Sequence, residues 1–374
     1  MSQPLWEQYR EQFPVTKNLV YLNHAAVGPL SRRAAEAMQG LAQDALEFGS
    51  EHYQQWMAAY EGVRVGTASM INATPSEIAI VKNTSEGIAT VALGIDWKPG
   101  DVIVAFEEEF PANLYPWQRL QARGVEIRRL SIFDDLDRID EAAKGARLLA
   151  ISYVQYLSGY RVDLDRIGEI CHRRGCFFFV DAIQGLGAFP VDVESSHIDA
   201  LSADAHKWLL GPEGCGVLYV RREVQDQIDP VEFGWTNVAK YADYSSRDMG
   251  LRQDAGRYEC GTLNTIGCFG VRAAVELLLE AGIENVRDAV QGLGDQLWNG
   301  ASELGFETLG RRSPETGAGI VSIRKSGVES QFIVRQLREA GFIAAPRQGW
   351  VRIAPHFYIA PAEIDALLRI LRTF

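Results

Sequence analysis

Short runs of branched and aromatic residues alternate along the chain with longer stretches whose apolar residues recur every three or four positions. The clearest runs are VIVAF, LLAISYV, FFFVDA and GVLYV, which begin at Val102, Leu148, Phe177 and Gly216. They predict buried strands, and the amphipathic stretches 113–123 and 163–174 predict helices between them. This alternation over residues 75–225 predicts an α/β fold with a mainly parallel sheet covered by helices. Functional residues are then expected just after strands, where open parallel sheets bind ligands.

The pattern changes on both sides of this region. Before it, two helices are predicted at residues 31–46 and 54–71, preceded by the apolar patch LVYLN. After Thr265 come helical stretches, the strand-like runs GIVSIR and WVRIAP, a helix at 330–339 and a terminal helix. A chain of 374 residues exceeds the roughly 250–300 residues of one core. We therefore predict an N-terminal segment and large domain over residues 1–262 and a small α+β domain over 263–374.

Composition narrows the class of protein. With 47% hydrophobic and 23% charged residues the chain is expected to fold, and a net charge of −12 argues against a nucleic-acid partner. No apolar run approaches the roughly 20 residues of a membrane span, and the first residues lack signal-peptide order, so a cytoplasmic protein without a membrane partner is expected. The five scattered cysteines are expected to be reduced, and no metal site is predicted from their spacing.

Two predicted strand ends carry a carboxylate and an amine. FFFVDAIQ delivers Asp181, and IDALSADAHKW delivers His206 and Lys207. This pair suits pyridoxal 5'-phosphate (PLP), because a carboxylate can keep its pyridine nitrogen protonated while a lysine forms a Schiff base with its aldehyde. Alternatively, Asp181 is a helix cap and Lys207 a solvated lysine. The flanking apolar residues and the glycine-rich turn GPEGCG favour the first interpretation.

A phosphate site is predicted upstream, in KNTSEGIATVALG. Thr84 and Ser85 stand directly before an apolar helical stretch, and hydroxyls and free amides at a helix start bind phosphate well. Gly87 is expected to leave space there. The alternative is an ordinary helix N-cap.

Together these segments resemble the class V aminotransferase family of PLP enzymes, which includes cysteine desulfurases, kynureninases and isopenicillin N epimerases. The resemblance runs from YLNHAAVGPL to VRIAPHFY. It rests on the order NTSEG, EFPANLYPW, VDAIQ, ADAHKWLLGPEGCG, RYECGTLN and VRIAPHFY. It implies a fold type I PLP enzyme that acts on an amino acid, with a large and a small domain.

The resemblance also implies roles for individual residues. Lys207 would be the catalytic residue that binds the cofactor covalently, and Asp181 would pair with the pyridinium. The remaining cofactor ligands would be Gln184 at the phenolic oxygen, Thr84, Ser85 and His206 at the phosphate, and Phe110 stacked on the ring. Arg352 would clamp the substrate carboxylate, a task for a planar two-pronged donor. Thr262 would reach the phosphate of a neighbouring subunit, which implies a homodimer with shared active sites.

Departures from the family pattern bear on the reaction. Desulfurases carry a nucleophilic cysteine on a loop before the carboxylate-binding arginine, whereas FIAAPRQGWVRIAP has none and looks shortened. Asp204 replaces a Ser or Thr near the phosphate, where it is expected to point away or to meet a donor. Tyr156 stands where desulfurases have Asn, and Cys260 is expected to be a small buried hydrophobe.

The sequence therefore predicts an aminotransferase or a β-eliminating carbon–sulfur lyase without the desulfurase cysteine. An amino-acid epimerase and a non-catalytic binding protein of the same fold are the alternatives. A nicotinamide-dependent dehydrogenase is disfavoured, because no G-x-G-x-x-G turn follows a predicted strand.

Overall fold

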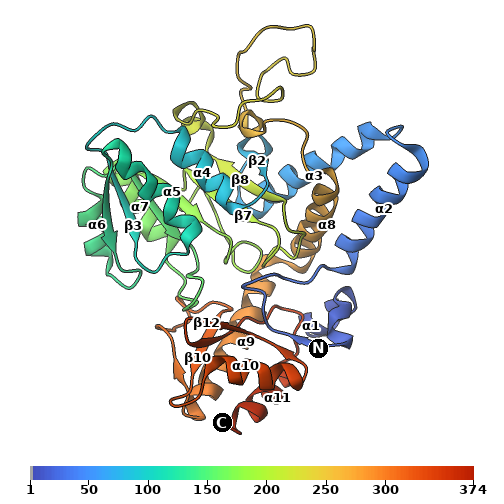
Figure 1. Ribbon diagram of the computed structural model, residues 1–374, viewed down its shortest axis with the longest axis vertical. Coiled ribbons are helices and arrows are strands. Elements are labelled where there is room, and N and C mark those ends of the chain that lie inside the picture. Colours follow the sequence, from blue (N-terminus) through green and yellow to red (C-terminus); the bar gives the residue numbers. More distant parts are fainter. Residues whose placement is uncertain (1–2) are drawn as a thin grey trace.

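A seven-stranded sheet forms the centre of the larger part of the computed structural model, which describes residues 3–374 (Figure 1). Its strands are β2 (Ile78–Val81), β3 (Val102–Phe106), β4 (Glu126–Leu130), β5 (Leu148–Ser152), β6 (Phe177–Asp181), β7 (Ala200–Asp204) and β8 (Gly216–Val220). Their spatial order is β2-β8-β7-β6-β5-β3-β4. Only β8 opposes its neighbours, β2 and β7, while the other pairs are parallel. The predicted α/β fold with a mainly parallel sheet is confirmed.

Most strands of this sheet are buried along their whole length, because helices cover both faces. Along β3, Val102, Val104 and Phe106 belong to one hydrophobic cluster, whereas Ile103 between them belongs to another. Successive strand residues point to opposite faces, so a continuous apolar run supplies both cores. The first core includes helices α3 (Tyr53–Ile71) and α7 (Leu164–Arg174), and the second includes α4 (Thr84–Gly94). No helix within residues 3–374 combines the length and apolar character that a membrane crossing needs.

Capping and proline explain where two predicted helices begin. Helix α7 starts after Asp163, whose side chain accepts a hydrogen bond from the Arg166 amide, and it ends at Gly175 with φ of 62°. The helix predicted at 113–123 is instead divided into the short helix α5 (Tyr115–Arg119) and flanking 3-10 turns. Pro116 accounts for the break before α5, because proline fits only the first turn of an α-helix and here occupies that turn.

The C-terminal part contains a four-stranded antiparallel sheet flanked by helices, below the large sheet in Figure 1. Its order is β12-β13-β10-β9, from β9 (Glu307–Thr308), β10 (Val321–Arg324), β12 (Ala345–Arg347) and β13 (Trp350–Ile353). The helices are α9 (Ile283–Glu303), α10 (Ser330–Glu339) and α11 (Pro361–Leu371). Helix α8 (Thr265–Ala281), by contrast, packs on α2 (Arg32–Phe48) and α3.

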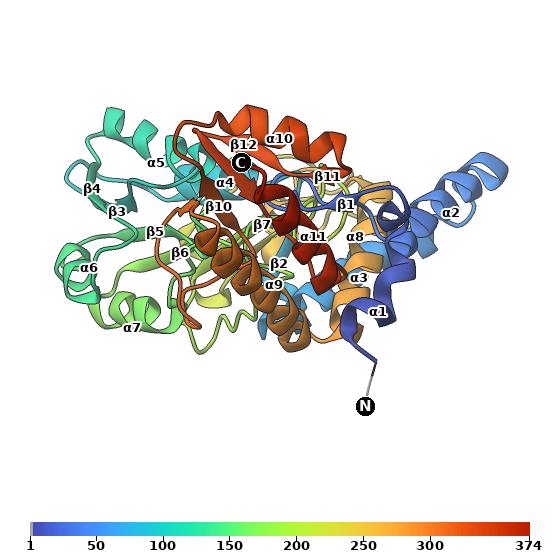
Figure 2. The ribbon, with the colours of Figure 1, turned by 90° about the horizontal axis from the view of Figure 1, so that it is seen from below.

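The N-terminal segment packs against the C-terminal part of the chain. Strand β1 (Val20–Tyr21) pairs in parallel with β11 (Phe342–Ile343), and Figure 2 shows the two side by side. Before it, helix α1 (Leu5–Tyr9) leads into Arg10, which makes two 2.8 Å hydrogen bonds to Glu363. Both this contact and the packing of α8 on α2 and α3 join residues from the two sides of residue 262. The division into two domains at that residue stays a prediction.

Candidate active site

A cavity of about 670 Å³ opens where the parallel strands of the large sheet end. Its walls come from segments that follow β2, β3, β5, β6 and β7, from the N-terminal segment and from the β12–β13 hairpin. The predicted residues that line it are Thr84, Ser85, Phe110, Asp181, Gln184, His206, Lys207 and Arg352. Tyr156 and Asp204, whose roles the sequence left open, line it too. The predicted site residues thus come together in one place, with Thr262 as the exception.

Asp181 and Lys207 form the electrostatic centre of the cavity. Asp181 is the last residue of β6 and is buried, and its Oδ1 accepts a hydrogen bond from the Ile183 amide at 3.0 Å. Burial raises the pKa of this carboxyl to about 6, while that hydrogen bond and Lys207 act against the rise. Burial lowers the pKa of the Lys207 amine to about 8, opposed by Asp181. An amine with such a pKa is a ready nucleophile near neutral pH.

The start of α4 provides donors for an anionic group. Asn83 caps the helix by accepting from the Glu86 amide at 2.9 Å, and the exposed Ser85 faces the cavity. Thr84 is buried, and its Oγ1 accepts a 2.9 Å hydrogen bond from the Asp204 amide, which ties α4 to the end of β7. Gly87 does not leave space in the cavity as expected. A Cβ there would lie 2.2 Å from Ser202 Oγ, so this glycine lets α4 pack on β7.

Asp204 meets donors, as the sequence analysis allowed, and it also borders the cavity. Its Oδ1 accepts from the Ala205 amide at 2.7 Å. Its Oδ2 lies 2.9 Å from Nδ1 of His206, although this nitrogen lacks the alignment of a hydrogen bond. The Asp204 carboxylate and the His206 ring therefore lie side by side at the edge of the cavity.

The residue that follows Lys207 is fixed by a buried chain of hydrogen bonds. Trp208 Nε1 donates to Gln184 Oε1 at 2.8 Å, and Gln184 Nε2 donates to the Ala25 carbonyl at 3.0 Å. The amide of Gln184 keeps one free N–H for a ligand. Next to Ala25, the Gly28 amide donates to the His206 carbonyl at 2.6 Å. A Cβ on Gly28 would lie 2.5 Å from the Lys207 carbonyl, so only glycine fits here.

Arg352 brings a guanidinium from the small sheet to the cavity. It is buried on β13, and its Nη1 donates to the Tyr156 carbonyl at 2.9 Å. Its Nε is buried without a hydrogen-bond partner among residues 3–374. Burial lowers the pKa of this arginine to about 10. A buried donor without a partner is costly, so a ligand carboxylate at this position would be well bound.

The aromatic wall consists of Phe110 and Tyr156. Their rings meet edge to face with centroids 5.3 Å apart, and Lys207 Nζ lies 5.9 Å from the Phe110 ring. Phe110 is 48% exposed, so its ring is available for a flat ligand instead of being consumed by core packing.

Three site features were missed by sequence reasoning. Arg347 and Gln348 of the β12–β13 turn line the cavity, as does the N-terminal segment 25–27. Glu109 lies buried behind the site, where its carboxylate accepts from the Ser152 amide at 2.6 Å, and Ser152 pairs across the sheet with Asp181. Burial raises the pKa of Glu109 to about 8. For Arg347, the only available signal was a second arginine close to Arg352 in the sequence. Glu109 belongs to the acidic run 107–109, which is typical of an exposed surface.

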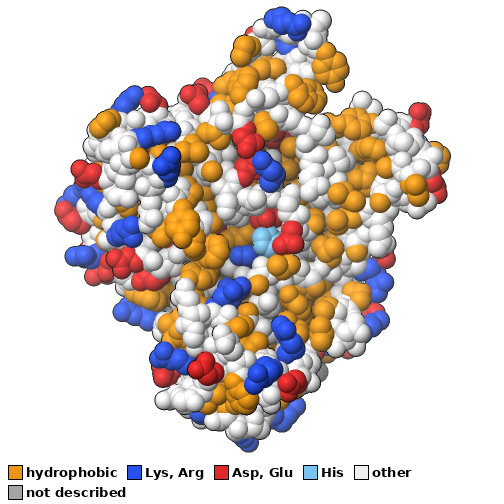
Figure 3. Space-filling view, in the orientation of Figure 1, with side chains coloured by type: hydrophobic (Ala, Val, Ile, Leu, Met, Phe, Trp, Pro, Cys, Tyr) orange, Lys and Arg blue, Asp and Glu red, His pale blue; other side chains and the backbone are white. Residues whose placement is uncertain are grey.

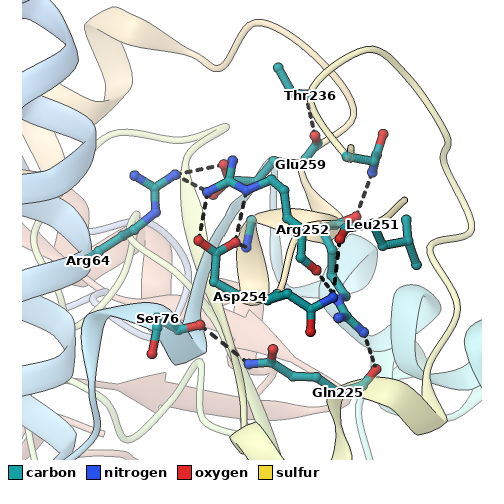
Figure 4. Close-up of polar contacts among 12 residues, drawn as sticks. Arg64, Ser76, Gln225, Thr236, Leu251, Arg252, Asp254 and Glu259 are labelled. Atoms are coloured by element: carbon teal, nitrogen blue, oxygen red, sulfur yellow. Dashed lines mark hydrogen bonds and ion pairs between the residues drawn. The ribbon is translucent and has the colours of Figure 1, made fainter. Parts of the chain in front are cut away.

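Thr262 is separated from the cavity. It lines a second cavity of about 250 Å³ together with Tyr53 and Trp235. The segment before it is anchored by Glu259, which receives 2.7 Å hydrogen bonds from Arg64 of α3 and a further one from Thr236 through its carbonyl (Figure 4). Cys260 beside it is exposed, contrary to the expected buried position. Neighbouring elements thus hold the Thr262 segment away from the chain's own Lys207.

The residues of the first cavity fit PLP. A carboxylate with a raised pKa, a buried lysine, an exposed aromatic ring and a helix start are the groups that the pyridine nitrogen, the aldehyde, the ring face and the phosphate require. The unpartnered Nε of Arg352 offers the remaining donor for an amino-acid carboxylate.

Comparisons with known proteins agree with this chemistry. The probable cysteine desulfurase of Pyrococcus abyssi is 30% identical over 98% of this chain and 96% of that protein. The uncharacterized aminotransferase YcbU of Bacillus subtilis is 29% identical over 96% and 95%.

Solved structures show the same architecture. The apo cysteine desulfurase from Thermococcus onnurineus NA1 superposes with a TM-score of 0.91 at 27% identity, covering 100% of this chain and 98% of that one. The cystine C–S lyase C-DES in complex with cysteine persulfide superposes with a TM-score of 0.89 at 26% identity, covering 97% of this chain and 100% of that one. A C-DES variant has glycine covalently linked to its PLP cofactor and gives 0.88 at 26%, covering 98% and 99%. The model of the family described as Aminotransferase class-V matches residues 20–350, and the chain therefore belongs to this family of PLP-dependent enzymes.

Proposed function

We propose that this enzyme is a β-eliminating carbon–sulfur lyase that acts on a sulfur-containing α-amino acid. The observation that carries the proposal is a cavity with the lysine, carboxylate and arginine of a PLP enzyme but without a cysteine among its lining residues. In the hairpin before Arg352, only Gln348 and Gly349 separate β12 from β13. A turn of this length supports the view that no nucleophilic cysteine loop is present, and the sulfur would leave directly with the product.

Each residue has a task in this proposal. Bound PLP supplies an electron sink that weakens the bonds at the substrate α-carbon. Lys207 holds the cofactor and moves the α-proton, and Asp181 keeps the pyridine nitrogen charged. Arg352 orients the substrate through its α-carboxylate. Cysteine and one water would yield sulfide, pyruvate and ammonia, whereas cystine and one water would yield cysteine persulfide, pyruvate and ammonia.

Product analysis tests the proposal. The PLP-loaded protein would be mixed with cysteine, cystine, alanine and kynurenine while its visible spectrum, pyruvate, sulfide and persulfide are followed. Pyruvate in proportion to the sulfur product supports the lyase. If alanine is the carbon product and its formation stops when the thiols of the enzyme are alkylated, the enzyme is a desulfurase and the proposal is wrong.

An aminotransferase is the second candidate, favoured by the similarity to the Bacillus subtilis aminotransferase. It would produce a keto acid only when an amino acceptor is added or in one stoichiometric turnover. Exchange of the α-proton without a keto acid would indicate an epimerase. A spectrum that no amino acid changes would indicate a non-catalytic binding protein.

We also propose that the enzyme is a homodimer in which Thr262 completes the partner's phosphate site. Two features support it: Thr262 lies outside its own chain's cavity, and the protruding segment 236–252 exposes Tyr244 by 81% and Met249 by 70%. Figure 3 shows hydrophobic side chains gathered on that protrusion. A cytoplasmic location remains a prediction from the sequence.

Complementation tests the shared site. A Lys207→Ala chain and a Thr262→Ala chain would each be inactive or weak alone. Mixed dimers would regain one complete site if Thr262 serves its partner. Absence of recovery in a verified mixed dimer would contradict the shared site.

A further inference from the structure

Two arginines point from one face of the β12–β13 hairpin toward the cavity. Arg347 pairs with Trp350, and Arg352 pairs with Ala345, in the antiparallel register of the two strands. Directly paired residues share a face of a sheet, and residues two apart on one strand share it as well. Arg347 and Arg352 are therefore diagonal neighbours on the same face, and both line the cavity.

The turn between the strands gives Arg347 a fixed origin. Gln348 and Gly349 have φ angles of 49° and 83°, as a two-residue hairpin turn requires. The turn is tied to the aromatic wall, because Gln348 Nε2 donates to the Tyr156 hydroxyl at 2.8 Å. The Arg347 backbone is thus held at the rim of the cavity while its side chain remains exposed.

The charge of Arg347 is not neutralised by any residue that the structure describes. No ion pair or side-chain hydrogen bond of Arg347 occurs in the described part, residues 3–374. The two carboxylates of the cavity have other contacts, since Asp181 accepts from Ile183 and Asp204 accepts from Ala205 next to His206. After burial, the positive charge of Arg347 is one of the causes that lower the pKa of Arg352 and of Lys207.

A simple α-amino acid brings one carboxylate to two neighbouring guanidinium groups. Arg352 is buried and has an unpartnered Nε, so it is the better site for the α-carboxylate. Arg347 lies nearer the rim, where the side chain of the substrate would extend. Its uncompensated charge then has no counterpart in a substrate with a neutral side chain.

We propose that Arg347 is a specificity residue that binds a second carboxylate, carried at the end of the substrate side chain. The substrate class is an α-amino acid with a distal carboxylate, which includes acidic amino acids and disulfide-linked amino acids such as cystine. This inference rests on the proposed function only in that an α-amino acid binds in this cavity. It holds for elimination and for transamination alike.

Spectral binding titrations of the PLP-loaded enzyme test the proposal. Aspartate is compared with asparagine and glutamate with glutamine, so each pair differs only in the distal charge. The wild-type enzyme should bind at least one acidic member roughly tenfold or more tightly than its amide, as expected for a charge-assisted bidentate pair. Arg347→Gln should remove this preference and leave the affinity for the amides unchanged.

The matched control is Arg324→Gln on the adjacent strand β10. Arg324 faces the same side as Trp350, but it pairs with Glu307 and does not line the cavity. Its replacement should preserve the preference for the acidic member.

The remaining outcomes separate a failure of this inference from a failure of the proposed function. If the wild-type enzyme binds the acid and the amide of both pairs equally well, it does not recognise a distal carboxylate, and the inference is wrong. Equal weakening of acid and amide by Arg347→Gln would place Arg347 with Arg352 on the α-carboxylate. If the preference for the acidic member depends on Arg347 but cysteine and cystine yield no pyruvate, only the lyase proposal is overturned. A spectrum that no amino acid alters would overturn both.

Discussion

Trp208 and Gln184 are joined by a buried hydrogen bond of 2.8 Å between the indole Nε1 and the amide Oε1. Trp208 directly follows Lys207, and Gln184 is three residues beyond Asp181. The same amide reaches Ala25, so this bond connects three separate walls of the cavity. The position of the Lys207 backbone is therefore coupled to the strand that carries Asp181.

Replacing Trp208 by Phe should destabilise the protein by about 1–3 kcal/mol, because it leaves a buried amide oxygen without its donor. The free energy of unfolding in urea measures this. Trp298→Phe is the control, since the Trp298 indole makes no side-chain hydrogen bond within residues 3–374. Equal losses in the two variants would show that the hydrogen bond contributes nothing beyond packing.

Lys207→Ala should abolish the borohydride-reducible link between protein and PLP, because Lys207 is the only lysine among the described residues that line the cavity. Mass spectrometry after reduction would identify the modified peptide. Lys82→Ala, at an exposed ion-paired lysine, should keep the link. A reduced adduct of unchanged yield in Lys207→Ala would refute the assignment.

The rate of PLP attachment to the apoprotein should rise with pH around a midpoint near 8. The reactive form is the neutral amine, and burial lowers the pKa of Lys207 to about 8, so the neutral fraction grows as the pH passes that value. Stopped-flow absorption at several pH values measures it. A midpoint near the ordinary lysine value of 10.5 would contradict the effect of burial.

We expect the unfolding free energy of the Asp181→Asn apoprotein, measured relative to that of the wild type, to increase as the pH rises from about 4 to 6. The pKa of Asp181 is raised from 3.8 to about 6 in the folded chain, so over this range the folded state binds more protons than the unfolded state. Stability of the wild type therefore falls with rising pH, by at most about 3 kcal/mol at 1.36 kcal/mol per pKa unit. Urea unfolding of both proteins at pH 4 and 7 tests this, and a constant difference would contradict it.

Arg352→Gln should weaken binding of every α-amino acid, acidic or amide, by about tenfold or more, because the lost donor contacts a group that all of them share. Spectral titration provides the dissociation constants. Unchanged affinities would assign the α-carboxylate to another residue.

Local patterns were sufficient for the parts of the site that follow strands. Asp181 and Lys207 could be predicted because apolar runs deliver them to a common edge of a parallel sheet. Arg347 could not, since an exposed arginine in a turn ordinarily faces solvent. The Pro116 break and the antiparallel β8 were also missed, because hydrophobic periodicity reports burial and not strand direction. The position of Thr262 depends on a second chain in our proposal, and a single sequence contains no distance between chains.

The pairing of β1 with β11 also constrains how the protein is made. His24 Nδ1 lies 2.8 Å from the Ala354 carbonyl oxygen, so the segment beside Lys207 is secured by a residue 330 positions later in the sequence. At a synthesis rate of about 5–20 residues per second, strand β1 leaves the ribosome roughly 16–64 s before its partner. Completion of the cavity therefore waits until β11 has been synthesised, and we expect stable cofactor capture only after that point.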